Sequence, residues 1–205
     1  MLIPRFYPIL DTEIAARHGV DVVAAAEQAI GAGASILQFR HKANFDREVL
    51  DRIERIAILC ARSETIFVIN DRADIARIFD AGLHLGQDDL SAKDARIVTG
   101  SKTRIGYSTH NEAQLKSAES EPVDYVALGP IFGTTSKQNP DPVVGLDGLR
   151  RLRPFTARPL VAIGGITREN ARSVIEAGAD SVAVIGDLFP DVRRRATEFI
   201  ARLSL

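Results

Sequence analysis

The sequence predicts one α/β domain, residues 1–205, folded as a (β/α)₈ barrel, or TIM barrel. Two observations predict this fold. One phrase recurs along the chain, in which a helical pattern ends at a Gly-containing turn and a short apolar strand follows at once. Strand and helix patterns also alternate through eight units, which indicates a parallel sheet that closes on itself. A doubly wound open sheet is the structural alternative.

The recurring phrase is clearest at residues 29–37, 80–85 and 177–185, which read AIGAGASIL, DAGLHL and AGADSVAVI. The Gly in each copy is expected to end a helix, because a residue without Cβ adopts a left-handed conformation at little cost. The apolar run that follows is typical of a strand covered on both faces. These segments therefore predict strands of a parallel sheet with helices packed outside it.

The remaining elements follow from the same pattern. The expected strands are residues 6–10, 35–39, 66–69, 83–85, 104–107, 125–128, 160–163 and 181–185. The expected helices between them include residues 20–32, 45–63, 113–118, 167–177 and 192–203. We find no linker or low-complexity segment, which supports a single domain.

The composition excludes several classes of protein. Lys and Arg number 26 against 27 for Asp and Glu, so the chain has no field that would attract nucleic acid or an anionic membrane. No apolar run approaches the roughly 20 residues of a membrane span, and we interpret the N-terminus as a strand and not as a signal peptide. Cys60, the only cysteine, lies in an apolar helical stretch and is expected to be a buried, inert thiol. We expect a cytoplasmic protein with small-molecule partners, either a monomer or a small homo-oligomer.

In a barrel of this kind, functional residues follow the carboxyl ends of the strands. The second strand leads into Gln38, Arg40 and Lys42, which share one side because side chains alternate along a strand. An amide with two cations is a plausible grip for a diphosphate, with Arg as the bidentate donor and Lys as the point charge. A solvated polar strand exit is the alternative.

Carboxylates follow the third and fourth strands. Asp71 comes directly after an apolar strand, and Asp88 and Asp89 follow the next one. Adjacent strands lie about 5 Å apart, so Asp71 and one of the two later carboxylates are expected to face each other across a single ion. Two carboxylates with substrate phosphate oxygens commonly hold Mg²⁺. Alternatively, Asp71 pairs with a nearby cation, and Asp88 or Asp89 caps the helix that begins near Ser91.

The fifth strand ends in Ser108 and His110, which have the same parity. They suggest a Ser–His nucleophile, but no third orienting acid is evident, and a turn serine with a surface histidine is the commoner arrangement. His18, His41 and His84 are interpreted as structural or exposed.

Glycines follow the last two strands. Gly164 and Gly165 come after the seventh strand and Gly186 after the eighth, where barrels commonly bind a phosphate monoester with backbone N–H groups. Residues 129–145 form the one long, Pro-rich connection, and its length suggests a mobile cover over the site. A tolerated insertion is the alternative. The sequence thus predicts two separate anion sites.

Taken together and in order, these motifs resemble those of the thiamine-phosphate synthase family. The most specific are QFRHK at 38–42, NDR at 70–72, HLGQDD at 84–89, GPIF at 129–132, TTSK at 134–137 and IGGI at 163–166. The resemblance implies an Mg²⁺-dependent transferase that joins hydroxymethylpyrimidine diphosphate to hydroxyethylthiazole phosphate, or its carboxylated form. The products would be thiamine phosphate and pyrophosphate.

The resemblance also implies roles for individual residues. The pyrimidine diphosphate would be held by Gln38, Arg40, Lys42, Asn70, Ser108 and Lys137. The thiazole phosphate would be surrounded by Thr134, Thr135, Ser136, Gly165, Ile185 and Gly186. Asp71 and Asp89 would be the Mg²⁺ ligands, which leaves Asp88 outside the metal's coordination. Ser108, Lys137 and Arg40 would act closest to the reacting bond.

Two positions depart from the family pattern. Gly186 stands where Ser is often found, and Ser136 stands where Thr is usual. Both lie on the expected thiazole-phosphate side. The alternatives are a thiazole tautomerase of the same superfamily, which would use His110 as its acid and base, and a non-catalytic barrel that binds thiamine precursors.

Overall fold

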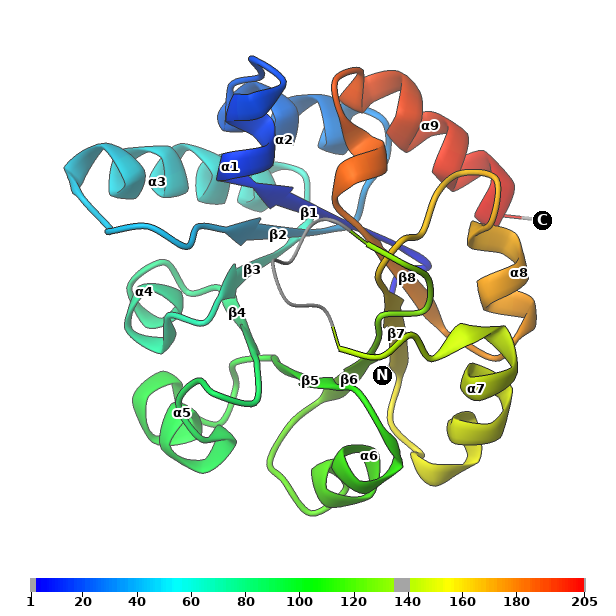
Figure 1. The fold of residues 1–205 in the computed structure, drawn as a ribbon. Coiled ribbons are helices and arrows are strands. Elements are labelled where there is room, and N and C mark those ends of the chain that lie inside the picture. Colours follow the sequence, from blue (N-terminus) through cyan, green and yellow to red (C-terminus); the bar gives the residue numbers. More distant parts are fainter. Residues whose placement is uncertain (1–2, 135–140, 205) are drawn as a thin grey trace.

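The computed structural model describes residues 3–134 and 141–204 of the chain. Eight parallel strands form a closed barrel in which each strand pairs with its neighbours in sequence and β8 pairs with β1 (Figure 1). The predicted (β/α)₈ barrel is confirmed, and the doubly wound open sheet is excluded because the sheet has no open edge.

All the expected strands are present, with ends that shift by one or two residues. The strands are β1 Phe6–Asp11, β2 Ile36–Arg40, β3 Ile66–Asn70, β4 Gly82–Leu85, β5 Ile105–Thr109, β6 Tyr125–Leu128, β7 Leu160–Ile163 and β8 Ser181–Val184. The α-helices are α1 Thr12–Arg17, α2 Val22–Gly31, α3 Arg47–Arg62, α4 Ala73–Ile78, α5 Ala92–Thr99, α6 Glu112–Ala118, α7 Gly145–Leu152, α8 Ala171–Glu176 and α9 Val192–Leu203. Two short 3₁₀ turns, η1 Arg153–Phe155 and η2 Gly186–Leu188, complete the described part of the chain.

The helix expected at residues 167–177 is shorter than predicted, because its first turn is replaced by a loop. Thr167 donates its backbone N–H to the Asn170 side-chain oxygen at 2.8 Å, and α8 begins only at Ala171. Asn side chains commonly capture nearby backbone groups in this way. The loop after β7 is thereby lengthened at the expense of the helix.

Polar side chains begin many of the helices. Their oxygen atoms accept hydrogen bonds from first-turn N–H groups, as expected for helix caps. These caps are Asp11, Asp21, Asp46, Ser91, Asn111 and Asp191. Since Ser91 caps α5, neither Asp88 nor Asp89 performs that role, which removes one alternative for these carboxylates.

The barrel has two apolar layers. Strand side chains that point outward pack against the surrounding helices and form the main core. A second cluster fills the barrel itself: Ile3, Tyr7, Ile9, Ile36, Val68, Tyr125, Ala127, Val161 and Ala183. This inner cluster forms a floor, as in other barrels whose interior is a packed core and not a pore. Ligands are therefore confined to the mouth above it.

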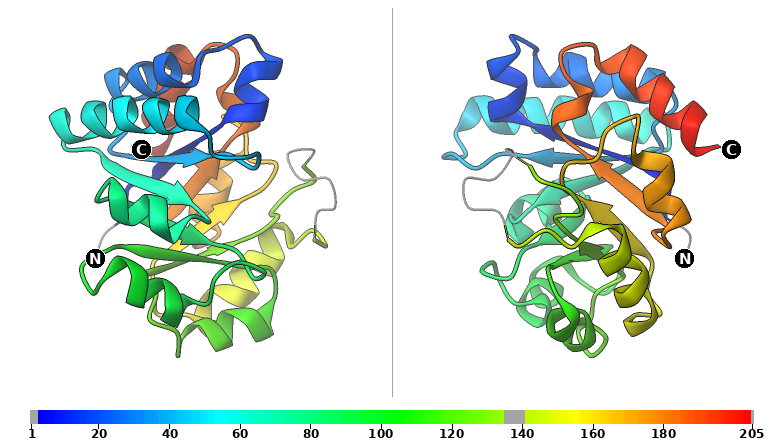
Figure 2. Two further views of the ribbon diagram at one scale, coloured as in Figure 1. Left: turned by 90° about the vertical axis from the view of Figure 1, so that its left-hand side faces the viewer. Right: turned by 45° about the vertical axis from the view of Figure 1, so that its right-hand side comes forward.

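Elements from the two ends of the described chain meet outside the barrel. Helices α2 and α9 lie side by side on the outside of the barrel, although they are far apart in the sequence (Figure 2). The Arg5 guanidinium also donates to the Leu203 carbonyl at 2.7 Å. The closed sheet is thus reinforced outside by contacts between the two ends of the fold.

Cys60 is buried in α3, and burial raises the pKa of its thiol to about 12, so it is the inert thiol predicted from the sequence. Among the described residues, none of the helices combines the length and the apolar character needed to cross a membrane.

Candidate active site

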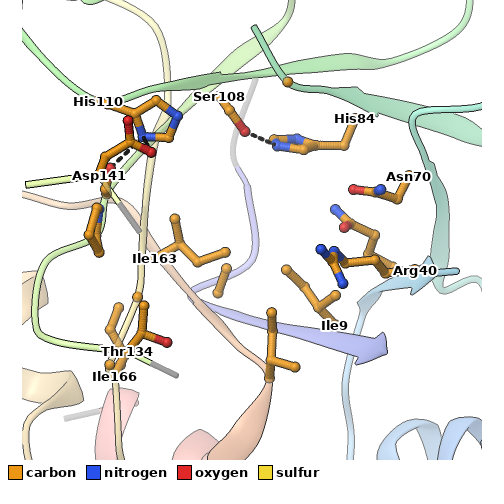
Figure 3. A pocket seen from close by; sticks show the side chains of 18 of the residues that line it. Ile9, Arg40, Asn70, His84, Ser108, His110, Thr134, Asp141, Ile163 and Ile166 are labelled. Atoms are coloured by element: carbon orange, nitrogen blue, oxygen red, sulfur yellow. Dashed lines mark hydrogen bonds and ion pairs between the residues drawn. The ribbon is translucent and has the colours of Figure 1, made fainter. Parts of the chain in front are cut away.

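A cavity of about 770 Å³ opens at the carboxyl ends of the barrel strands. It gathers every predicted site residue that the structure describes: Gln38, Arg40, Lys42, Asn70, Asp71, Asp89, Ser108, Thr134, Gly165, Ile185 and Gly186. Figure 3 shows Arg40 and Asn70 on one side, with Thr134 and Ile166 on the other. Thr135, Ser136 and Lys137 lie outside the described residues, as do residues 138–140 of the expected cover.

Arg40 is held in place by a carboxylate that sequence reasoning missed. Asp11, at the end of β1, is directly opposite Arg40 in the strand register, and the two side chains form an ion pair. The same Asp11 carboxylate accepts the Ile14 N–H at 2.9 Å and so begins α1. Asp11 is buried. The sequence did contain a signal for this pair, since Asp11 ends one apolar strand and Arg40 ends the next. The guanidinium therefore reaches the cavity with its direction already fixed.

Two carboxylates meet at the ends of β3 and β4. Asp71 binds the Lys42 ammonium at 2.6 Å, and Asp89 accepts the Gly86 N–H at 2.6 Å. Burial is the main cause that raises the pKa of the Asp71 carboxyl. Asp89, within hydrogen-bonding reach, raises this pKa further, whereas Lys42 lowers it. Two carboxylates that disfavour each other's charge are a fitting place for a cation.

The backbone of Asp71 is strained. Its φ angle is 64°, in the left-handed region that costs a non-glycine residue about 1 kcal/mol or more. A hydrogen bond from the Asp71 N–H to the His84 carbonyl, at 2.8 Å, holds this conformation. Strain of this kind is commonly retained where a side chain must point in one direction for function.

The donor set is suited to Mg²⁺ only if a ligand completes it. No group of three or more His, Cys, Asp or Glu side chains is gathered for a metal within residues 3–134 and 141–204. Asp71 and Asp89 alone supply too few oxygens for an ion that takes octahedral coordination, so water and substrate oxygens must supply the rest. Beside them, the buried Asn70 amide nitrogen has no hydrogen-bond partner among the described residues. Such a donor is costly to leave unmet and fits an incoming anion.

Ser108 is hydrogen-bonded to His84, and not to His110, the histidine that shares its parity on the fifth strand. Its hydroxyl lies 2.9 Å from the His84 Nε2 atom, and the His84 Nδ1 atom lies 3.1 Å from the Tyr125 hydroxyl. Burial lowers the pKa of His84 to about 4, so this imidazole is neutral at neutral pH. The third group, Tyr125, is a phenol and not a carboxylate, and burial raises the pKa of its hydroxyl well above the ordinary value. The arrangement lacks the orienting carboxylate of a nucleophilic triad.

Tyr125 and Tyr7 form the polar part of the barrel floor. Their hydroxyl groups lie 2.9 Å apart, and the Gln38 amide donates to Tyr7 at 3.1 Å. Gly106 in β5 makes room for this floor, since a Cβ atom there would lie 2.0 Å from the Tyr125 ring. Sequence reasoning missed both tyrosines, although their strand parity would have placed them inside the barrel.

His110 lies at the rim of the cavity. Its Nδ1 atom donates to the Gly129 carbonyl at 2.6 Å and lies 3.5 Å from the Asp141 carboxylate. Figure 3 shows His110 directed toward Asp141, on the far side of Ser108 from His84. The histidine thus ties the end of β5 to the loop after β6.

The opposite side of the cavity is built from backbone. Gly164 and Gly165 have φ angles of 97° and 63°, which favour glycine. A Cβ atom on Gly165 would lie 2.5 Å from the Gly133 carbonyl oxygen. The Phe132 N–H donates to the Gly164 carbonyl at 3.0 Å, which joins the loops after β6 and β7. Close packing of two loops therefore requires glycine here.

Asp187 fixes the loop after β8. Its carboxylate accepts the Arg168 N–H at 2.9 Å and the Arg168 side chain at 3.0 Å. The Arg195 guanidinium binds the other carboxylate oxygen at 3.0 Å. Gly186, immediately before it, begins the η2 turn. The loops after β7 and β8 are thus held together by one carboxylate.

Comparisons with known proteins identify the family. The family model described as thiamine monophosphate synthase matches residues 6–188. The chain belongs to this family. The thiamine-phosphate synthase of Koribacter versatilis is 49% identical over 201 residues, covering 97% of this chain and 95% of that protein. The thiamine-phosphate synthase of Chloroflexus aurantiacus is 37% identical, covering 98% of this chain and 93% of that one.

A solved structure agrees with the sequence relatives. The thiamine phosphate pyrophosphorylase from Pyrococcus furiosus superposes with a TM-score of 0.86 at 30% identity, covering 98% of this chain and 95% of that one. The family resemblance seen in the sequence motifs is therefore confirmed over nearly the whole chain.

Proposed function

We propose that this chain is a thiamine-phosphate synthase that joins hydroxymethylpyrimidine diphosphate to hydroxyethylthiazole phosphate and releases pyrophosphate. The observation that carries the proposal is a single cavity, in a member of this family, whose two sides are each suited to an anion. One side presents Arg40, Lys42 and the Asp71–Asp89 pair, and the other presents the Gly165 and Gly186 loops. Two phosphorylated substrates that meet in the middle account for both.

Mg²⁺ fits the first side. Asp71 and Asp89 would hold the ion, with oxygens of the substrate diphosphate and water completing its coordination. When bound, the ion supplies positive charge that stabilises the departing pyrophosphate. Asp88 is exposed and has no assigned part in binding.

The reaction breaks one bond and forms another. The C–O bond between the pyrimidine methylene carbon and the diphosphate breaks, and its electron pair leaves with pyrophosphate. Arg40 and Lys42, with Lys137 from the TTSK segment, offset the charge that grows on the leaving group. The electron-rich aminopyrimidine stabilises the positive carbon that remains. Ser108 and Gln38 hold this ring in place, and the buried Asn70 amide donates to the diphosphate.

The second substrate completes the reaction. The lone pair of the thiazole nitrogen forms the new C–N bond, and the nitrogen becomes quaternary without losing a proton. No general base is therefore required, and positioning supplies much of the acceleration. Thr134, Gly165, Ile185 and Gly186, with Thr135 and Ser136 of the TTSK segment, surround the thiazole phosphate.

The rest of the proposal concerns the protein as a whole. We expect residues 1–205 to act as one domain in the cytoplasm, as a monomer or a small homo-oligomer, with its substrates as the main partners. Sedimentation of the purified protein measures the oligomeric state directly.

The proposal is tested by supplying both substrates with Mg²⁺ and measuring pyrophosphate and thiamine phosphate. Equal amounts of the two products are expected, and omission of either substrate should abolish both. If neither product forms with the hydroxyethylthiazole phosphate or its carboxylated form, the synthase assignment is wrong. His110→Ala separates the tautomerase alternative, because a synthase should keep turnover within about tenfold whereas loss of an essential acid and base costs about 100-fold or more.

A further inference from the structure

A continuous chain of hydrogen bonds crosses the cavity floor. It runs from Gln38 to Tyr7 at 3.1 Å, from Tyr7 to Tyr125 at 2.9 Å, from Tyr125 to His84 at 3.1 Å, and from His84 to Ser108 at 2.9 Å. These five residues, here named the floor relay, come from five different strands. Figure 3 shows the last link, between His84 and Ser108. Both ends of the relay line the cavity, whereas Tyr7 and Tyr125 lie beneath it.

The middle of the relay is shielded from water. Tyr7 is 1% exposed and Tyr125 is 0% exposed. Burial raises the pKa of the Tyr7 hydroxyl to about 12, so the hydroxyl stays protonated at neutral pH. A buried hydroxyl has one proton to donate, and leaving that proton unpaired is costly. Each link therefore constrains the next.

The relay has one direction. The Gln38 amide nitrogen can only donate, so the Tyr7 oxygen accepts and the Tyr7 proton goes to Tyr125. Tyr125 in turn donates to the His84 Nδ1 atom, which leaves the imidazole proton on Nε2. His84 then donates to Ser108. Because the Ser108 oxygen accepts the hydrogen bond from His84, the Ser108 hydroxyl proton is directed to a partner in the cavity.

We propose that the floor relay sets the hydrogen-bonding polarity of the pyrimidine site, so that Ser108 presents a donor and Gln38 presents its carbonyl acceptor to the same ring. This inference rests on the proposed function. Tyr7, Tyr125 and His84 are positioning residues, which act through the two residues that contact the substrate. The site would bind an aminopyrimidine ring more tightly than the corresponding pyrimidinone ring.

The two rings differ at both contact points. An aminopyrimidine offers a ring nitrogen that accepts and, next to it, an amino group that donates. In the pyrimidinone the ring position carries a proton and the adjacent group is a carbonyl oxygen, so donor and acceptor are exchanged. Each mismatched contact weakens binding by about 10-fold to 100-fold. Because each hydrogen bond of the floor relay fixes the direction of the next, Ser108 could become an acceptor only if every hydrogen bond of the relay reversed.

The test compares the affinities of two diphosphates in the presence of Mg²⁺ and without the thiazole substrate. One is hydroxymethylpyrimidine diphosphate, and the other is its analogue with oxygen in place of the ring amino group. The wild-type protein should prefer the amino compound by about 100-fold or more, on the same estimate for two contacts. Tyr125→Phe removes one hydroxyl and frees the His84 tautomer, so the preference should fall by about 10-fold.

Tyr107→Phe is the matched control. Tyr107 lies on β5 and packs against the outer core. Its substitution therefore removes the same hydroxyl group but leaves the floor relay intact. This variant should keep the wild-type preference. In all three proteins the KM of the thiazole phosphate should stay within about twofold, because the relay lies outside the glycine loops that hold that substrate.

If Tyr125→Phe still prefers the amino compound as strongly as the wild-type protein does, the relay is overturned. An equal loss of affinity for both compounds also overturns it, because that result indicates only a general structural role for Tyr125. If Tyr125→Phe does not fold, Tyr7→Phe interrupts the relay at the next link and is judged in the same way. A wild-type protein that makes no thiamine phosphate overturns the proposed function itself. An active wild-type protein whose preference survives both substitutions overturns only the relay.

Discussion

The two sides of the cavity, each proposed to hold an anion, are built in different ways. The side formed by β2, β3 and β4 uses charged side chains, each held by a partner, as Arg40 is by Asp11 and Lys42 is by Asp71. The side formed by β7 and β8 uses glycine backbone, packed so closely that Gly165 has no room for a Cβ atom. The first side is vulnerable to loss of charge, and the second to addition of atoms. Substitutions should therefore separate the two substrates.

The largest effect is expected from Asp71→Asn. The amide keeps the shape of the side chain but removes the charge that would hold Mg²⁺, so turnover should fall by about 100-fold or more. Asp88→Asn is the control, because it makes the same chemical change at an exposed carboxylate close to Asp89. Pyrophosphate release at saturating substrates measures both. Near-normal turnover in Asp71→Asn would remove the metal assignment.

The opposite side is tested by Gly165→Ala. The new methyl group would meet the Gly133 carbonyl oxygen and displace the loop, so the KM of the thiazole phosphate should rise by about 10-fold or more. The KM of the pyrimidine diphosphate should change little. Steady-state kinetics with one substrate varied at a time measures this difference.

Gly19→Ala separates strain from collision. Gly19 has a φ of 66°, close to the 63° of Gly165, but nothing lies within 4 Å of the position of its Cβ. Both variants should lose about 1 kcal/mol of stability from the unfavourable φ angle, measured by thermal unfolding. Only Gly165→Ala should alter KM. A raised KM in both variants would show that strain alone is responsible.

A smaller effect is expected from Asp11→Asn. The amide still accepts the Ile14 N–H, so α1 keeps its cap, but Arg40 loses its charged partner. The KM of the pyrimidine diphosphate should rise by about 5-fold to 10-fold as the guanidinium becomes less ordered. Asp21→Asn, in an aspartate that caps α2 at the exposed surface, is the control. Equal effects of the two substitutions would assign Asp11 a capping role only.

The smallest effect is expected from Gly186→Ser. Gly186 begins a 3₁₀ turn, a conformation that serine adopts readily, and the added hydroxyl lies beside the proposed phosphate site. The KM of the thiazole phosphate should fall by no more than about fivefold, the value of one additional hydrogen bond. An increase of more than tenfold would indicate that the space at Gly186 is itself required.

The parts of the fold that sequence could predict are those determined by local pattern. Apolar runs located every strand, three of them directly after glycine turns, and alternation along a strand placed Gln38, Arg40 and Lys42 on one side. The pairing of Asp11 with Arg40 was not predictable in this way, because it depends on the register between strands. The contact between His84 and Ser108 likewise depends on register, because these residues lie on the paired strands β4 and β5. The sequence pattern offered only His110 as a partner for Ser108, because the two are near neighbours with the same parity, and it favoured a turn serine with a surface histidine.

The hydrogen bond between Arg5 and the Leu203 carbonyl indicates that the order of the strands along the chain can be permuted. Each strand already pairs with its sequence neighbours, and β8 pairs with β1, so the barrel has no strand that must come first. A short linker across Arg5 and Leu203 should allow the chain to be reopened elsewhere. The connection between α6 and β6 is suitable, because it lies at the end of the barrel away from the cavity. A circularly permuted protein should then keep both halves of the active site.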